Sequence, residues 1–399
     1  MASSGNKGLT KILELVEAQS NALQSAKQSH NASKQAYDST GYYPDPMVKF
    51  NYFVSPIETR NGPQRSNLMV SQVIPWPSSL QADEDVAAKM IIVKAEQVEV
   101  LRLELIFNVK SMIYKYIEIN EKIETKKKMI ITLNNLSQVV LGRLKLGSAN
   151  QAELSRISIE VAKLTQAIKK LETRKVSIQG KLKSLTGGAS VDHLLPTSFD
   201  PAWGKLSGFN PSGINLKEHP YIKLFSAKVG ASGAEIERKK SRRLPKIQAS
   251  ASWFQIDEPN SEMMGLDAGK DAWALGASIS VPIWSSKYDS SEYSAVSKQK
   301  AAQLDLKQKE LDLQYEIDNS YEEYLSTSEI SGIFANDILP QANQALKADR
   351  ESYSQGAAPF ERIITSYIRV IKFEDQLIEN QVKQAVLKAS LERLVGRNL

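Results

Sequence analysis

The chain has 399 residues, of which 42% are hydrophobic and 24% charged, and its formal net charge is +6. It contains no cysteine, which excludes disulfides, thiolate metal sites and cysteine nucleophiles, and its 3 histidines are too scattered for a histidine metal site. The 51 basic and 45 acidic residues are interleaved, which indicates a mixed-charge surface, so no nucleic-acid partner is expected. No apolar run approaches the roughly 18 residues of a transmembrane helix. The start of the chain lacks a signal-sequence pattern, which indicates either a cytosolic protein or a removed signal.

The first elements along the chain are a helix at about 8–38 and a β-hairpin at about 47–75. Within the hairpin, Leu68 and Val70 alternate with more polar residues, as expected for a strand with two different faces. The proline and Asn-Gly signals at 56–66 predict a polar loop between the two strands.

A very long helix is predicted next, at about 78–146, followed by a return helix at about 149–186. The long helix would span roughly 100 Å at about 1.5 Å per residue, so it must pack along another helix. Its Lys126-Lys127-Lys128 run is expected on the outer face. The return helix carries a coiled-coil seam with 3-4 spacing, formed by Leu154, Ile157, Val161, Leu164, Ile168, Leu171, Lys175, Ile178, Leu182 and Leu185.

The second half repeats this order after a linker at about 188–216. The expected elements are a helix at 217–241, a hairpin at about 246–283, a long helix at about 286–355 and a return helix at about 359–396. Gly332 and Pro340 interrupt the long helix, where a kink or overwinding is expected. The second seam is weaker because Ser366, Asn380 and Gln384 occupy three of its positions.

The halves are copies of one unit, offset by about 209 residues. Gly147 and Gly356 are each followed, after the same interval, by a Leu-x-x-Leu-x-Gly ending. Pro75-Trp76 in the first copy corresponds to Pro282-Ile283-Trp284 in the second. The duplication predicts a first repeat at 1–187, an equatorial linker at 188–216 and a second repeat at 217–399.

The four strands have the length and alternation of membrane-spanning strands, about 9–11 residues with one apolar face. A half-buried sheet in a soluble protein is the alternative. Four strands cannot close a barrel, but three chains would together supply twelve. Trp253, Trp273 and Trp284 would then form an aromatic girdle at the membrane interface.

Several short motifs stand at the element boundaries. They are Tyr43-Pro44-Asp45-Pro46, Val70-Ser71-Gln72-Val73-Ile74-Pro75-Trp76-Pro77, Arg243-Leu244-Pro245, Pro282-Ile283-Trp284, Ile338-Leu339-Pro340, Tyr353-Ser354-Gln355-Gly356 and Leu391-Glu392-Arg393-Leu394-Val395-Gly396. In their order, spacing and duplication they resemble the TolC family of outer-membrane efflux proteins, over essentially the whole chain. The Val-Ser-Gln-x-Ile-Pro run is similar to the heavy-metal and cation-efflux branch of that family.

The resemblance implies a mainly α-helical chain with a small β portion and four transmembrane strands. It implies a homotrimer with a twelve-stranded barrel in the outer membrane and a helical barrel that crosses the periplasm. The implied function is the exit duct of a tripartite efflux pump for small molecules or ions. Its partners would be an inner-membrane transporter, a periplasmic adaptor and outer-membrane lipid, and its signal sequence would have been removed from this chain.

Three alternatives remain open from the residues. A type I secretion channel uses the same family, a trimeric adhesin also builds twelve strands from three chains, and a soluble coiled-coil scaffold shares the long helices. No nucleophile–base pair, phosphate loop or carboxylate dyad stands out, so neither enzymatic activity nor a metal or other cofactor is expected.

Two groups of functional residues are predicted near the turns between long and return helices. Given the family, the turns are expected to contact the adaptor, through Gly147, Ser148, Ala149, Gln355, Gly356, Ala357 and Ala358. The channel must also close here. Some relatives use acidic residues at two positions that Arg362 and Thr365 occupy in this chain, so closure is expected to use pairs of Arg362 with glutamate. The candidate gate residues are Glu153, Glu361, Arg362 and Thr365.

Overall fold

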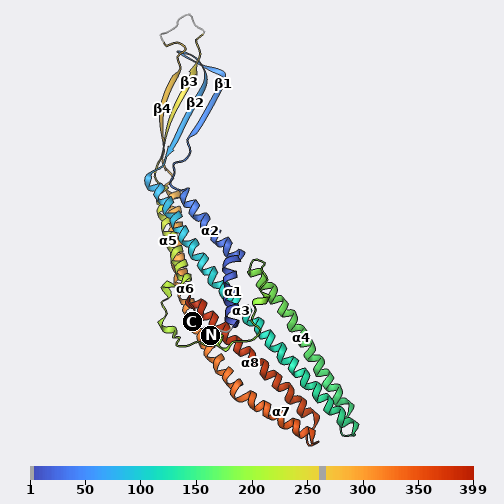
Figure 1. Ribbon diagram of the computed structural model, residues 1–399. Helices are drawn as coiled ribbons and strands as arrows, with labels where there is room; N and C mark the ends of the chain where they lie inside the picture. Colours follow the sequence, from blue (N-terminus) through green and yellow to red (C-terminus); the bar gives the residue numbers. More distant parts are fainter. Residues whose placement is uncertain (1–3, 260–266) are drawn as a thin grey trace. The chain divides into compact units, whose positions relative to one another are not determined.

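The computed structural model describes residues 4–259 and 267–399, and Figure 1 shows the order of its helices and strands. By their contacts the residues form two compact units. Unit 1 comprises Met1–Lys27, Gln97–Ile222 and Lys309–Leu399, and unit 2 comprises Gln28–Glu96 and Lys223–Gln308. Each unit therefore combines residues from both halves of the chain.

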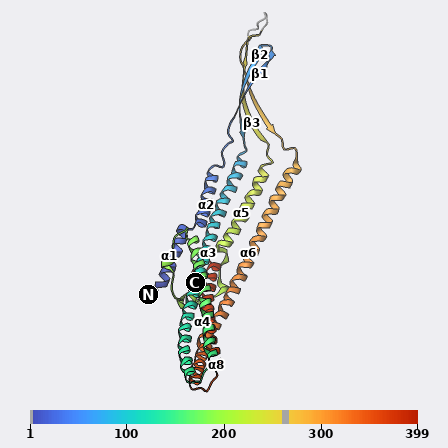
Figure 2. The same ribbon diagram turned by 90° about the vertical axis from the view of Figure 1, so that its right-hand side faces the viewer.

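Unit 2 contains a four-stranded antiparallel sheet whose strand order follows the sequence (Figure 1), and Figure 2 shows the same sheet turned by 90°. The strands are β1 Met47–Thr59, β2 Gly62–Ile74, β3 Lys246–Ile256 and β4 Ala272–Ser280. β2 and β3 pair from Ser66 opposite Gln255 to Ile74 opposite Ile247, so the sheet joins the two halves of the chain. Within the described residues, β1 and β4 each keep one unpaired edge.

The first hairpin is tighter than the sequence predicts. Instead of a loop at 56–66, β1 and β2 extend until Thr59 lies opposite Gly62, and a two-residue turn remains. Gly62 has a φ of 126°, and a Cβ there would collide with the backbone oxygen of Asp257. Pro56 was a misleading loop signal, because an edge strand tolerates proline. The centre of the second predicted loop, 260–266, lies outside the described residues.

The two faces of the sheet differ in chemistry. On one face the register aligns apolar rows, formed by Val48, Val70, Ala251 and Leu275 and by Phe50, Leu68, Trp253 and Trp273. In the single chain this face is open, with 91% of Leu275 exposed. The opposite face is polar, and Asn51 donates from Nδ2 to Oδ1 of Asn67 at 3.2 Å. The alternation predicted from the sequence is therefore confirmed.

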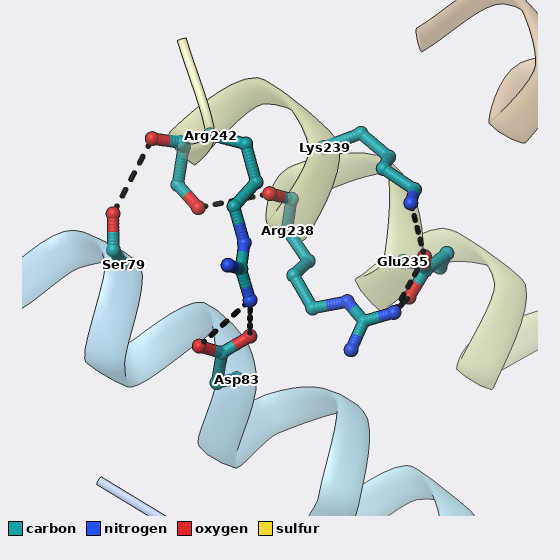
Figure 3. Close-up of polar contacts among 7 residues, drawn as sticks. Ser79, Asp83, Glu235, Arg238, Lys239 and Arg242 are labelled. Atoms are coloured by element: carbon teal, nitrogen blue, oxygen red, sulfur yellow. Dashed lines mark hydrogen bonds and ion pairs between the residues drawn. The ribbon is translucent and has the colours of Figure 1, made fainter. Parts of the chain in front are cut away.

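The basic stretch at the end of α5 (Pro220–Ser241) is neutralised inside unit 2 (Figure 3). Nη2 of Arg242 lies 3.1 Å from Asp83 of α3 (Pro77–Lys145), and Glu235 pairs with both Arg238 and Lys239. Burial raises the pKa of Glu235, but these two cations lower it by more, and the net shift is downward. In all, Arg238, Lys239, Lys240, Arg242 and Arg243 pair with Asp83, Glu235, Glu237, Asp289 and Glu292. The stretch is a charge-balanced helix end.

Helices make up unit 1. Its elements lie in α1 Ser4–Gln19, α3, α4 Gln151–Leu185, α6 Ser285–Ile333, α7 Leu339–Ser354 and α8 Phe360–Val395. The helix predicted at 8–38 is divided at Ser20 into α1 and α2 (Asn21–Asp38). A core of buried side chains from both repeats includes Ile12, Ile113, Ile117, Leu182 and Ala385. In the described part of the chain, no helix is both long and apolar enough to cross a membrane.

Two of the three polar positions of the weaker seam on α8 have partners. The Ser366 hydroxyl donates to Oδ2 of Asp349 at 2.5 Å. Nε2 of Gln384 donates to the Tyr324 hydroxyl at 3.3 Å. Because buried polar groups without partners are costly, these contacts explain how the seam tolerates serine and glutamine.

The second long helix is irregular where Gly332 and Pro340 led us to expect it. A π-helical turn, Phe334–Ile338, connects α6 to α7, and Pro340 occupies the first turn of α7. Proline has no N–H and clashes with the carbonyl four residues earlier, and a wider turn accommodates both effects. The expected overwinding is therefore wrong, because the turn is wider than a regular α-helical turn.

Three half-buried or buried lysines of α3 pair with carboxylates of α8 in unit 1. The pairs are Lys110–Glu392 at 2.6 Å, Lys122–Glu379 at 2.5 Å and Lys126–Asp375 at 2.5 Å. Burial lowers the pKa of Lys122, but its hydrogen bonds to Glu118 and Glu379 raise it by more. The outer-face prediction is wrong for Lys126, whose side chain is 9% exposed.

The linker consists of short turns that lead into α5. Its 3-10 turns are Asp192–Leu194, Pro201–Gly204, Pro211–Gly213 and Leu216–Glu218. At its end, Nε2 of the buried His219 lies 3.0 Å from the Arg393 carbonyl, and Nδ1 accepts from the Tyr221 N–H at 3.1 Å. The ring is therefore a neutral tautomer that donates from Nε2 and accepts at Nδ1.

Acidification is expected to destabilise this junction. Burial lowers the pKa of His219, and the nearby charges of Arg393 and Lys309 lower it further, while its bond to the Arg393 carbonyl raises it. The pKa of a histidine in the unfolded chain is about 6.5. The contribution of neutral His219 to stability is therefore fully present above that pH and is lost as the pH falls toward the lower pKa of the folded protein. Thermal unfolding between pH ~7.5 and ~5 should show this loss in the wild type and a smaller loss in His219→Gln. The exposed His193, replaced with glutamine, is the control, and equal pH slopes in all three proteins would contradict the assignment.

Candidate functional site

The two turns between long and return helices share one backbone conformation. The Ser148 N–H donates to the Arg143 carbonyl at 2.9 Å, and the Ala357 N–H donates to the Ser352 carbonyl at 2.9 Å. Gly147 and Gly356 have φ values of 71° and 77°, a left-handed conformation that favours glycine. The duplicated glycines thus end α3 and α7 in the same way.

The predicted tip residues divide by exposure. Gly147, Ser148, Gln355, Gly356 and Ala357 are exposed, whereas Ala149 and Ala358 are half-buried. The sequence analysis missed Leu146, whose side chain is 83% exposed beside Gly147. The tip therefore combines small or polar residues with one large exposed apolar side chain.

Arg143 joins the two turns. Its Nη1 donates to the Tyr353 carbonyl, and its Nη2 donates to the Ser148 carbonyl at 3.1 Å. The guanidinium lies 4.5 Å from the centroid of the Tyr353 ring, a cation–π arrangement. One side chain thus connects the end of α3 to both turns, a role for Arg143 that sequence analysis missed.

A second connection between the hairpins runs from Tyr353 to Glu153. The Tyr353 hydroxyl donates to Oε2 of Glu153 at 2.5 Å, while its ring packs edge-on against Phe360. Burial raises the pKa of Tyr353, and the bond to Glu153 raises it further. The phenol therefore stays protonated and remains a donor. Glu153 is further placed by Asn150, whose side chain accepts from the Glu153 N–H and begins α4.

The other gate candidates use different partners. Glu361 pairs with Arg156 of α4, a third connection between the hairpins. Arg362 pairs with Asp349 of α7 at 2.6 Å, and Asp349 is buried. Within this chain, Arg362 therefore pairs with an aspartate and not with the expected glutamate. The sequence could not indicate Asp349, because this carboxylate lies on the preceding helix and is selected by packing.

Thr365 and Arg362 line a groove between α7 and α8 near the second turn. The groove has a volume of about 520 Å³. Its walls include Ala345, Ala348, Pro359, Glu361, Ser366 and Arg369. Small side chains from both helices thus leave an open channel beside the Arg362–Asp349 pair.

The candidate gate region consequently contains two kinds of contact. Arg143–Tyr353, Tyr353–Glu153 and Arg156–Glu361 connect the α3–α4 hairpin with the α7–α8 hairpin. Arg362–Asp349 connects only α8 with α7. Within the described residues, no group of three or more His, Asp or Glu side chains could hold a metal ion.

The tryptophans that are predicted to form a girdle lie at both ends of the sheet in unit 2. Trp253 and Trp273 are opposite each other, and Nε1 of Trp253 donates to Asp271 at 3.1 Å. Trp284 follows the other end of β4 and is 71% exposed. Trp76, which lies in the motif that corresponds to the one containing Trp284, follows β2 and donates to the Pro245 carbonyl at 2.5 Å. The structure adds Trp76 to the candidate girdle.

Comparison with known proteins finds one family model and several solved structures that are similar to this chain. Residues 214–397 match the family described as outer membrane efflux protein. No curated protein matches the sequence. The solved structures include a membrane protein from Pseudomonas aeruginosa, 14% identical with a TM-score of 0.83, over 98% of this chain and 90% of that chain.

Two further structures are similar at the same level. The outer membrane protein VceC from Vibrio cholerae is 14% identical with a TM-score of 0.78, over 98% of this chain and 96% of that one. The open-state MtrE outer membrane channel of Neisseria gonorrhoeae is 13% identical with a TM-score of 0.78, over 98% of this chain and 89% of that chain. The expected fold class, mainly helical with four antiparallel strands in a TolC-like arrangement, is confirmed.

Proposed function

We propose that this chain, which belongs to the outer membrane efflux protein family, forms the exit duct of a tripartite pump as a homotrimer. It is an efflux channel of the outer membrane that extends into the periplasm, and members of its family form trimeric channels. The duct would carry small molecules or ions outward, and its energy would come from an inner-membrane transporter.

The observation that carries the proposal is a sheet with an open apolar face and two unpaired edges. Unpaired strand edges cannot be left in lipid, because each N–H and C=O without a partner there costs several kcal/mol. If β4 of one chain pairs with β1 of the next, three copies of the four strands close a ring of twelve. The apolar rows through Leu275 and Trp273 would then contact lipid, and the polar face would line the pore.

The exposed turns are the proposed contact surface for the periplasmic adaptor. Gly147, Ser148, Gln355, Gly356 and Ala357 present backbone and small side chains that allow close approach. Leu146 adds an apolar anchor next to them. The same conformation in both copies would give a trimer six similar contact points (two turns on each of three chains).

Closure of the duct is proposed to depend on the contacts near these turns. Glu153 and Glu361 would hold the α3–α4 and α7–α8 hairpins together through Tyr353 and Arg156. Arg362 and Thr365 would shape the neighbouring groove on α7 and α8. Opening then requires the hairpins to separate, which breaks the contacts between them.

The assembly is tested by mass and conductance of the purified protein. Outer-membrane fractionation, a trimer mass in detergent and discrete conductance in planar bilayers are the expected results. A monomer that remains in solution without detergent and forms no channels would overturn the proposal.

A further inference from the structure

We propose that the polar face of the β-sheet makes the duct selective for anions, through Lys49 and Lys246. This inference rests on the proposed function, because it takes that face to line the pore. Rings of lysine or arginine in a pore wall favour anions, just as rings of carboxylates favour cations.

Both lysines lie on the polar face. Lys49 is opposite Met69 on β2, Met69 is opposite Ser252 on β3, and directly opposite residues share a face. Lys246 lies on β3 at an even number of positions from Ser252, so it points to the same side as Ser252. At its own level Lys246 is opposite Ser280 of β4.

No carboxylate lies in the regularly paired strand segments that carry the two lysines. The stretches 47–52, 66–74, 246–255 and 272–280 contain Lys49 and Lys246 as their charged residues and no aspartate or glutamate, and Glu58 lies opposite Pro63 beyond the register shift of β1. β4 carries no charge, so a second copy that pairs its β4 with β1 brings no carboxylate to Lys49. Three chains would therefore place six positive charges (two from each chain) on the wall of the pore.

Nearby carboxylates do not cancel this charge. Asp83 lines the same cavity as Lys246, but it is engaged by Arg242 at 3.1 Å. Asp45 precedes β1 outside the paired ladder. Among the described residues, no ion pair engages the amine of Lys49 or Lys246, and the basic end of α5 is balanced by its own carboxylates.

The first experiment measures ion selectivity. In planar bilayers under a KCl gradient, the reversal potential of the wild-type channel should indicate that chloride is more permeant than potassium. Lys49→Gln and Lys246→Gln should each lower that preference by at least about twofold, since each variant removes one charge from every chain of the trimer and a single unit charge roughly 10 Å from an ion in water changes its local concentration about twofold before screening. Lys270→Gln, beyond the ladder and paired with Asp267, is the control and should change it less.

The second experiment identifies the face. Because the chain has no cysteine, Lys49→Cys introduces a single thiol. A sulfonate-bearing, water-soluble thiol reagent should reach it and turn the preference toward potassium. Val48→Cys, on the opposite face one residue away, should leave selectivity unchanged after the same treatment.

The outcomes separate the two proposals. An absence of channels in every variant would contradict the proposed function itself. Channels that show no chloride preference, or that keep it in the double variant Lys49→Gln/Lys246→Gln, would overturn the anion selectivity alone. Modification through Val48→Cys rather than Lys49→Cys would also overturn it, because the lysines would then face lipid.

Discussion

Replacing Tyr353 with phenylalanine is expected to make the closed channel leak. The change removes one hydroxyl, which donates to Glu153 at 2.5 Å, and keeps the ring that packs against Phe360. Hydrogen bonds to charged groups contribute about 1.5–3 kcal/mol, and half-burial of Glu153 reduces this to about 1–2 kcal/mol. That loss would shift the balance between joined and separated hairpins by roughly 5- to 30-fold. Single-channel recording should show a matching rise in open probability.

Two comparisons test whether the effect comes from this contact. Glu153→Gln should raise open probability as well, and the double variant should add little, because both substitutions weaken one bond. Tyr315→Phe removes a hydroxyl from a side chain that is 69% exposed and should leave gating unchanged. If Tyr353→Phe and the wild type have the same open probability, the contact has no part in closure.

Replacing Lys126 with methionine is expected to destabilise unit 1 by about 2–4 kcal/mol. The substitution leaves Asp375 half-buried without its cation, and breaking a buried pair typically costs about 3–5 kcal/mol. The expected loss of stability is smaller than this here because the Asp375 side chain is 26% exposed. Denaturant unfolding in detergent, followed by helical circular dichroism, gives the free energy of unfolding.

The neighbouring residue provides the control for this prediction. Lys127 is 53% exposed and pairs with Glu124 three residues earlier, so Lys127→Met should cost less than about 0.5 kcal/mol. Lys126→Met/Asp375→Leu should recover much of the lost stability, since an apolar pair replaces an unpaired charge. Equal stabilities of Lys126→Met and Lys127→Met would show that the Lys126 pair contributes nothing to folding.

The comparison of the two repeats could have identified more of the candidate gate residues than it did. At the shared offset, Arg143 corresponds to Ser352 and Tyr353 corresponds to Leu144. At both positions the two copies carry different residues, and one of the two can form a hydrogen bond that its counterpart does not form. Such a difference indicates a contact that is present in only one copy. Asp349 and Arg156 carried no such signal, because charged residues are common on helix surfaces and most do not become partners.

The sequence alone determined the elements and their order. Strand alternation, seam spacing and the turn glycines are local patterns, and the strands, the long helices and both turns follow them because periodicity decides which face is buried. Only the tertiary structure decided how the elements combine. β2 pairs with β3 and α3 pairs its lysines with α8, so each compact unit mixes the two repeats. Lys126 and Asp375 are 249 residues apart, and no local pattern indicates which lysine of a run is buried beside a distant carboxylate.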